Sequence, residues 1–312
     1  MIETLQSLEW RVVGASVRGA SHERSGLPNQ DAIKWVPPSG LGVSVAVAIS
    51  DGHGSAKSFR SARGSQIAVA TATGEVQDVL DAHSALGLSA IKREVEERLP
   101  QRLVRNWATA VNAELEQEPL SEPELGRLEE KEGASARRSV EKNPLLAYGA
   151  TVVTVVVAPP FIVFAQLGDG DILAVSDGGQ VSRPLASDDR LFANETTSLC
   201  MVDAWRDFRI VFHVLDERTA PALLLLSTDG YANSFRDDGS FLKVGSDILE
   251  MIRSDGLDKV EQNLTNWLTE ASRVGSGDDI TLGIVCRTLT AGKAARDAAT
   301  AAEKHGDEPA DW

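Results

Sequence analysis

Residues 43–55 have the sequence VSVAVAISDGHGS, in which an apolar stretch leads into a turn that carries a carboxylate and an imidazole. Val and Ile alternate with Ala and Ser, and this period of two predicts a strand buried on at least one face. The two glycines that follow allow a tight turn with exposed backbone carbonyls. Asp51 and His53 therefore lie where a rigid strand meets a loop, although a plain Asp-Gly turn with a surface histidine gives the same pattern.

Aspartates recur where other apolar stretches of the chain end or begin. Each of them adjoins a stretch with strand character, as Asp51 does. Because several strand ends can meet at one edge of a sheet, the pattern predicts a cluster of carboxylates there. The acids are Asp169 after residues 161–168, Asp229 after residues 223–228, and Asp278 with Asp279 before residues 280–286.

The composition of the 312-residue chain supports a sizeable core and argues against two classes of partner. Hydrophobic residues make up 42% of the chain, which suffices for one large domain or two small ones. There are 46 acidic residues against 31 Lys and Arg, for a formal net charge of −15. A surface of this sign repels nucleic acid and anionic membranes, so we expect neither as a partner.

The cysteines and the apolar segments predict a cytoplasmic protein. Cys200 and Cys286 are the only cysteines, too few for a disulfide framework or a thiolate zinc site. The acidic start of the chain lacks the basic region of a signal peptide. The longest apolar run, residues 145–167, contains Pro159 and Pro160 and is predicted as two strands around a turn, not as a membrane span.

The first fifty residues predict a pair of antiparallel strands that brings two acids together. A first strand over residues 10–18 is followed by a polar loop. Asp31 stands at the start of a short strand over residues 32–36, and Asp51 stands at the end of the strand described above. In an antiparallel pair those two ends are neighbours, so Asp31 is expected beside Asp51.

Helical periodicity then replaces the strand pattern. Apolar residues at helical spacing predict one helix over residues 55–80 and a second over residues 91–115, which Pro100 should kink or split. Residues 116–143 are acidic, then basic, with almost no apolar side chains. This composition predicts a mobile surface insertion.

The second half of the chain returns to strands and ends with two helices and a last strand. We expect helices over residues 245–253 and 257–272. We expect one domain over residues 1–287, with the insertion 116–143 inside it, and the charged, Ala-rich tail 288–312 is expected to be disordered. The pieces fit an α+β fold of two packed antiparallel sheets flanked by helix pairs. The predicted strands are 150–157, 161–167, 171–176, 208–214, 223–227 and 280–286.

The predicted cluster has the chemistry of a metal site. Hard carboxylate oxygens with one conspicuous imidazole suit Mg²⁺ or Mn²⁺ better than Zn²⁺ or copper. Two ions about 3.5–4 Å apart would activate a bridging water for attack on a phosphate, and a nearby histidine would protonate the leaving oxygen. No nucleophile-elbow or Cys-His signature for a covalent mechanism is evident. The candidates are Asp31, Asp51, Asp169, Asp229 and Asp278, with Asp171 and Asp279 as further possibilities.

Six short motifs in a fixed order support a more specific hypothesis. Together they span about residues 10–287, and the chain resembles the type 2C protein phosphatases, which are metal-dependent serine/threonine phosphatases. The resemblance implies an α-β-β-α sandwich with the metal site at one end. The motifs are NQDA (29–32), DGHG (51–54), GAT (149–151), GDGD (168–171), STDG (227–230) and GDDIT (277–281).

The resemblance also implies a role for each matching residue. Two Mn²⁺ or Mg²⁺ ions are expected, with a third, weaker one. His53 resembles the general acid, and Asp31 resembles an acid that orients metal-bound water and can also contact a metal. The metal ligands implied are Asp51 as the bridge, the Gly52 carbonyl for the second ion, Asp229 and Asp278 for the first, and Asp169 with Asp229 for the third.

Three positions depart from the family pattern. Gln30 replaces a frequent metal-binding Glu, and a neutral amide is a poorer ligand. Gly26 stands where a phosphate-binding arginine is often found. Arg24 or Arg18 is the substitute candidate, with a surface role as the alternative for either. Asp171 replaces the arginine of the fourth motif; the resemblance implies a structural role for that arginine, and Asp171 would then simply begin the next strand.

The function predicted from these residues is that of a monomeric, cytoplasmic signalling hydrolase. It would remove phosphate from phosphoserine or phosphothreonine of a phosphorylated protein by attack of a water bound to a binuclear metal centre. Two alternatives stay open at this stage. One is a pseudophosphatase that binds a partner without turnover, and the other is a phosphatase for a small metabolite.

Overall fold

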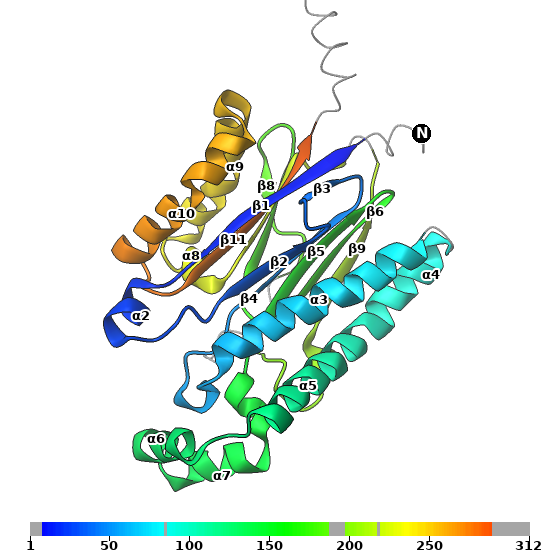
Figure 1. The fold of residues 1–312 in the computed structure, drawn as a ribbon. Helices are drawn as coiled ribbons and strands as arrows, with labels where there is room; N and C mark the ends of the chain where they lie inside the picture. Colours follow the sequence, from blue (N-terminus) through cyan, green and yellow to red (C-terminus); the bar gives the residue numbers. More distant parts are fainter. Residues whose placement is uncertain (1–7, 84–85, 187–196, 217–218, 289–312) are drawn as a thin grey trace, which may run out of the picture.

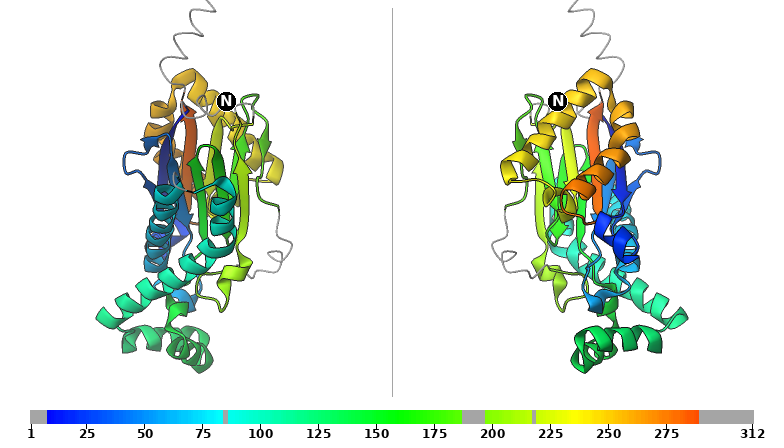
Figure 2. Two further views of the ribbon diagram at one scale, coloured as in Figure 1. Left: turned by 90° about the vertical axis from the view of Figure 1, so that its right-hand side faces the viewer. Right: turned by 90° about the vertical axis from the view of Figure 1, so that its left-hand side faces the viewer.

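The computed structural model describes residues 8–83, 86–186, 197–216 and 219–288, so nearly all of the predicted tail lies outside the described residues. Within them, two antiparallel sheets pack face to face and helix pairs cover the two outer faces (Figures 1 and 2). The predicted α+β class and the α-β-β-α layering are confirmed. The domain boundary at residue 287 stays a prediction.

The first sheet carries the beginning and the end of the described chain. Its strands run in the order β3-β1-β11-β10-β7-β8, and each strand pairs antiparallel with its neighbours. Strand β11 pairs with β1 over nine residues, although the two are separated by most of the sequence. The strands are β1 (Glu9–Val17), β3 (Leu41–Gly42), β7 (Asp171–Val175), β8 (Val181–Ser182), β10 (Leu223–Ser227) and β11 (Ile280–Thr288).

The second sheet contains the strand predicted from residues 43–50. The order of its strands is β2-β4-β5-β6-β9, again antiparallel. Ala32 of β2 lies opposite Ser50 of β4. Asp31, directly before β2, and Asp51, directly after β4, are therefore at adjacent strand ends, as predicted. The strands are β2 (Ala32–Val36), β4 (Val45–Ser50), β5 (Val152–Ala158), β6 (Phe161–Leu167) and β9 (Arg209–Val214).

Strand β4 shows why its residues alternate between large and small. Val45, Val47 and Ile49 belong to the core between the two sheets, where they pack with Leu224 and Val285. The intervening alanines face the other way, toward a helix, and small side chains let the helix backbone approach the sheet. Both faces of β4 are therefore buried, which exceeds the one buried face that the pattern required.

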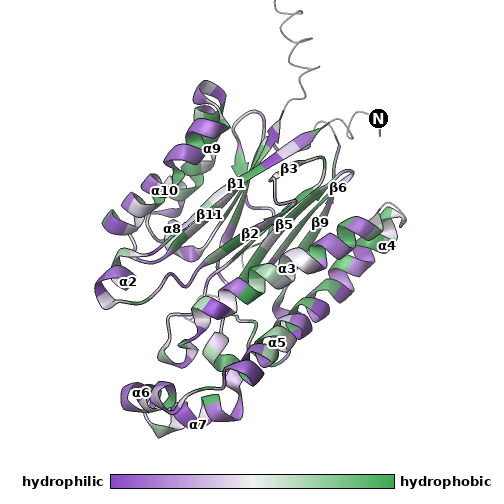
Figure 3. Cartoon of the chain, in the orientation of Figure 1, coloured by the Kyte–Doolittle hydropathy of each residue, from purple (hydrophilic) through white to green (hydrophobic). Residues whose placement is uncertain are grey.

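Helix pairs cover the outer faces of the sandwich. Their apolar faces point inward and their outer faces are hydrophilic (Figure 3), so burial of one stripe on each helix holds the layers together. None of the described helices combines the length and the hydropathy that a membrane span requires. On the second sheet lie α3 (Ser61–His83), α4 (Leu88–Arg93) and α5 (Leu99–Gln117), and on the first lie α9 (Asp238–Asp255) and α10 (Leu257–Val274).

The predicted break at Pro100 is present. A π-helical segment, Glu94–Arg98, joins α4 to α5, and Pro100 occupies the first turn of α5. The Leu99 N–H donates to the Glu94 carbonyl, five residues back, and this wider turn accommodates a proline, whose ring clashes with the preceding turn of a regular α-helix. The predicted continuous stripe is thus two helices with a widened turn between them.

The predicted insertion differs from the expectation in its secondary structure. Residues 116–143, for which we predicted no helix, contain two helices, α6 (Glu122–Glu132) and α7 (Ala134–Lys142). Leu125, Leu128 and Val140 are buried against the second sheet's helical layer. So few apolar residues gave no visible periodicity, but they suffice when the rest of each helix faces solvent.

Candidate metal centre

Three aspartates from different strand ends meet at one end of the sandwich. Asp51 follows β4, Asp169 follows β6, and Asp229 begins the short helix α8 (Asp229–Ala232) directly after β10. One carboxylate oxygen from each lies within 4.8 Å of the other two. The cluster predicted from strand ends is therefore present for these three residues.

The turn after β4 is held by the strand that follows the helices. The Asp51 N–H donates to Thr151 Oγ1 at 3.0 Å, and the Thr151 N–H donates to the Asp51 carbonyl at 2.8 Å. The His53 N–H donates to the Gly149 carbonyl at 3.0 Å. A Cβ on Gly52 would lie 2.6 Å from the Ser61 carbonyl oxygen, so only glycine fits this close backbone approach.

Asp31 lies beside this cluster in a buried position. Its Oδ2 accepts a hydrogen bond from Thr228 Oγ1 at 2.8 Å, while its Oδ1 has no partner among the described residues. Burial raises the pKa of Asp31 to about 8, with the Thr228 hydroxyl opposing the shift and the charges of Asp279 and Asp229 adding to it. An orphaned buried oxygen next to three carboxylates fits a cation ligand.

The carboxylates of the cluster also raise one another's pKa. Burial, followed by the charge of Asp31, raises the pKa of Asp51. Burial, followed by the charge of Asp169, raises the pKa of Asp229 to about 6. Crowded carboxylates resist ionisation in the absence of a counter-charge, and a bound divalent cation supplies one. The electrostatics of the cluster thus favour cation binding.

Asp278 lies near the three clustered carboxylates but is not one of them. It is exposed, it acts electrostatically on Asp229, and its Oδ1 accepts the Asp279 N–H at 2.9 Å. Its neighbour Asp279 is only 4% exposed and accepts three hydrogen bonds from the protein. Of the two acids that precede β11, Asp278 is therefore the one available to a cation.

Asp171, a further possibility at the sequence level, is engaged elsewhere. Arg183, directly after β8, donates from Nε to both of its carboxylate oxygens, at 3.0 and 2.9 Å, and also binds Asp238 at the start of α9. The guanidinium lies over the ring of Phe241. The arginine expected at position 171 is thus an acid here, paired with an arginine twelve residues further along the chain, and the role is structural.

His53 is partly buried at the edge of the cluster. Burial lowers its pKa below the usual value, while the charge of Asp169 opposes the shift. Its backbone N–H donates to the Gly149 carbonyl, which fixes the backbone from which the imidazole projects.

The remaining predicted residues have contrasting surroundings. Gln30 Nε2 donates to Ser61 Oγ at 2.8 Å, and its Oε1 is buried without a partner among the described residues. Arg18 donates from Nη2 to the His22 carbonyl at 2.9 Å, and its buried Nε has no described partner. Arg24 is exposed on the short helix α2 (Ala20–Ser25).

Sequence reasoning missed the residues that support this site. Thr151 and Thr228 lie in the motifs, but their hydroxyls matter only because strands from distant parts of the chain meet. His22 gave no signal in the sequence, because it lies in a stretch that reads as a polar loop. That stretch forms a helix of only six residues without a buried side chain.

Residues 18–269 match the family model described as protein phosphatase 2C. The chain belongs to the protein phosphatase 2C family. The resemblance predicted from the six motifs is confirmed, and the match covers the clustered Asp51, Asp169 and Asp229. A comparison with curated proteins gives no match.

Solved structures of several bacterial proteins share this fold. The serine/threonine phosphatase PstP/Ppp of Mycobacterium tuberculosis is 17% identical with a TM-score of 0.52, over 89% of this chain and 99% of that chain. The catalytic domain of PstP in complex with two manganese ions is 16% identical with a TM-score of 0.52, over 90% and 99%. PppA, a regulatory component of the T6SS in Pseudomonas aeruginosa, is 17% identical with a TM-score of 0.51, over 89% and 98%. At this identity the likeness concerns the fold of the 2C phosphatases.

Proposed function

We propose that this chain is a metal-dependent phosphatase that hydrolyses phosphoserine and phosphothreonine in proteins. The observation that carries the proposal is the meeting of Asp51, Asp169 and Asp229, whose oxygens lie within 4.8 Å of one another. Carboxylates without thiolate or multiple imidazole ligands suit Mn²⁺ or Mg²⁺. The two manganese ions in the PstP catalytic domain support this choice of cofactor.

The residues present fit two such ions. The buried Asp31 Oδ1 without a described partner and the raised pKa values of Asp51 and Asp229 indicate a site built for positive charge. Two bound ions would supply Lewis-acid activation of water and neutralise phosphate oxygens. The ligands we propose are Asp51, the Gly52 carbonyl, Asp229, Asp278 and Asp169, with Asp31 beside them.

The chain's own groups would then position the substrate and move a proton. We assign His53 as the group that protonates the leaving serine or threonine oxygen, because it lies in the turn that carries Asp51. Arg18 and Arg24 are both proposed for phosphate contact: Arg24 is exposed, and Arg18 already donates from Nη2 to the His22 carbonyl.

The test is phosphate release from a phosphothreonine peptide with Mn²⁺, with Mg²⁺ and with EDTA. We expect release that requires metal. A folded chain that releases no phosphate with either metal would support a binding module instead. Release from small phosphorylated metabolites but not from peptides would support the metabolite phosphatase.

The cellular setting is part of the same proposal. Cys200 and Cys286 are both buried and form no disulfide, which suits a reducing cytoplasmic compartment. Signalling is the role that we propose for a protein phosphatase there. The phosphorylated protein substrate is the partner we expect, and a monomeric state stays a prediction.

A further inference from the structure

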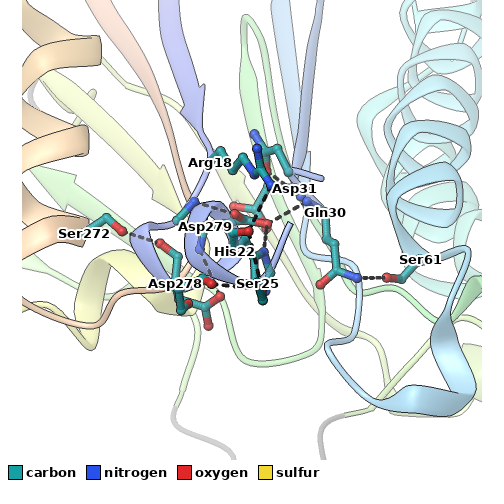
Figure 4. Close-up of polar contacts among 12 residues, drawn as sticks. Arg18, His22, Ser25, Gln30, Asp31, Ser61, Ser272, Asp278 and Asp279 are labelled. Atoms are coloured by element: carbon teal, nitrogen blue, oxygen red, sulfur yellow. Dashed lines mark hydrogen bonds and ion pairs between the residues drawn. The ribbon is translucent and has the colours of Figure 1, made fainter. Parts of the chain in front are cut away.

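We propose that His22 and Asp279 form a positioning pair that holds the loops of Asp31 and Asp278 in place for cation binding. The inference rests on the proposed function, and it assigns a role to two residues that contact neither substrate nor metal in that proposal. The pair joins α2 to the loop before β11, two segments more than 250 residues apart in the sequence (Figure 4).

Asp279 is the centre of the arrangement. Its Oδ2 accepts the Gln30 N–H at 2.6 Å and lies 2.9 Å from His22 Nδ1, while its Oδ1 accepts the Gly19 N–H at 2.6 Å. A carboxylate only accepts, so His22 Nδ1 is the donor. With 4% exposure, this charge depends on those three donors in place of water.

Hydrogen bonds through Gln30 connect the pair to the adjacent ends of β2 and β4, where Asp31 and Asp51 lie. Gln30 precedes Asp31, and the hydrogen bond from the Gln30 N–H fixes the peptide between Asn29 and Gln30, one residue before Asp31. The Gln30 carbonyl in turn accepts the Gly52 N–H at 3.1 Å. Gly52 follows Asp51, and a hydrogen-bonded path therefore runs from Asp279 to the proposed bridging ligand.

Through its own backbone the pair also reaches Asp278. The Asp279 N–H donates to Asp278 Oδ1 at 2.9 Å, and the Asp278 carbonyl accepts Ser272 Oγ–H at 2.8 Å. A Cβ on Gly19 would lie 2.3 Å from the Asp278 carbonyl carbon, so the two loops are in direct backbone contact. Movement of Asp279 would displace Asp31 and Asp278 together.

His22 is held where it can control Asp279. The Arg18 Nη2 and the Leu27 N–H both donate to the His22 carbonyl, at 2.9 and 3.0 Å, and the Ser21 N–H donates to the Gly277 carbonyl at 2.8 Å. The imidazole side chain is 13% exposed. Partners that orient metal ligands commonly change metal affinity by about 10- to 100-fold when they are removed.

The experiment compares two variants of His22 in the full chain. His22→Asn keeps a donor near the position of Nδ1, whereas His22→Leu keeps a similar volume without a donor. Mn²⁺ affinity is measured from the EPR signal of free Mn²⁺, which needs no substrate, and thermal unfolding is followed in EDTA. His213→Leu, at an exposed histidine of β9, is the matched control.

We expect His22→Leu to weaken Mn²⁺ binding about tenfold, with His22→Asn and His213→Leu close to wild type. A purely structural contact would lower the melting temperature in EDTA and leave Mn²⁺ affinity unchanged, and that result overturns the role. Equal weakening in the Asn and Leu variants overturns it too, because the donor would then not matter.

A second variant keeps the proposal open to refutation if His22→Leu does not fold. Asp279→Asn retains the volume and one acceptor oxygen but removes the charge, and it should weaken Mn²⁺ binding in the same direction. Unchanged affinity in that variant overturns the positioning role. A folded wild-type chain that binds no Mn²⁺ overturns the proposed function as well, whereas normal wild-type binding with unaffected variants overturns only the positioning pair.

Discussion

The cluster of Asp51, Asp169 and Asp229 and the Glu124–Arg60 ion pair, which holds the α6–α7 helix pair on the core, use acidic residues in opposite ways. Burial alone would raise the pKa of Glu124 on α6, but two hydrogen bonds from Arg60, at 2.8 and 2.9 Å, and those from Ser121 lower it to about 2. Asp51 and Asp229 form no ion pair with a described Arg or Lys, and burial raises the pKa of both. A carboxylate with an arginine stabilises the fold, whereas a carboxylate kept without one retains affinity for a cation from solution.

The largest expected effect is that of Asp51→Asn, which tests the cluster's side of this comparison. Phosphate release should fall by about 10³-fold, because several kcal/mol of transition-state stabilisation by the cations is lost. The same variant should melt at a higher temperature than wild type in EDTA, because a buried carboxylate beside Asp31 and Asp229 is removed. Activity assays and calorimetry check the two effects.

A result in the other direction would break the comparison. If Asp51→Asn keeps wild-type activity, the metal assignment is wrong. If it melts at a lower temperature in EDTA, the unpaired carboxylates do not destabilise the metal-free fold.

A smaller effect is expected for His53→Ala, which separates proton transfer from cation binding. The rate should fall by about 10²-fold for a phosphothreonine peptide and far less for p-nitrophenyl phosphate, whose leaving group scarcely needs a proton. Mn²⁺ affinity should stay near the wild-type value. Equal losses on the two substrates would exclude His53 as the general acid.

The smallest expected effect is that of Glu124→Gln on the free energy of unfolding, which tests the carboxylate that is paired with an arginine. Because the pKa of Glu124 in the folded chain lies below its ordinary value of 4.5, its stabilisation is complete above pH 4.5 and is lost as the pH falls toward 2. Once solvent screening is allowed for, Glu124→Gln should destabilise the fold by about 1 kcal/mol at neutral pH. Urea unfolding at pH 7 and at pH 3 should show a smaller difference between variant and wild type at the lower pH.

An unchanged difference at the two pH values would contradict this account of the α6–α7 helix pair. Asp258→Asn is a suitable control, because Asp258 is a more exposed carboxylate whose ion pair with Arg11 lies on a different face. Its effect on urea unfolding should be smaller at pH 7, because its side chain is 73% exposed, against 22% for Glu124.

Much of the fold, and the cluster of Asp51, Asp169 and Asp229, could be predicted from short local patterns in the sequence. The alternation in β4 predicted a buried strand, and the antiparallel pairing of β2 with β4 brought Asp31 beside Asp51 as expected. Acids at strand ends predicted the cluster of Asp51, Asp169 and Asp229, because strand ends in a sandwich lie at a common edge. These features depend on local periodicity, which is visible in a single sequence.

Other features depend on pairings that no local pattern records. Asp278 and Asp279 are adjacent acids, yet one is exposed and the other accepts hydrogen bonds from Gly19, His22 and Gln30. Asp171 has the same chemistry as the clustered acids but meets Arg183. Which partner an acid meets is decided by the packing of distant elements.

The sequence by itself therefore determined the strands, the turn at Asp51 and the kind of chemistry that its acids support. The tertiary structure alone decided which acids lie together in a cluster and which pair with an arginine. It also decided that residues 116–143 form helices packed on the core. The physical reason is that side-chain type and period are local properties. Burial, and with it the pKa of each carboxylate, arises only when separate segments exclude water together.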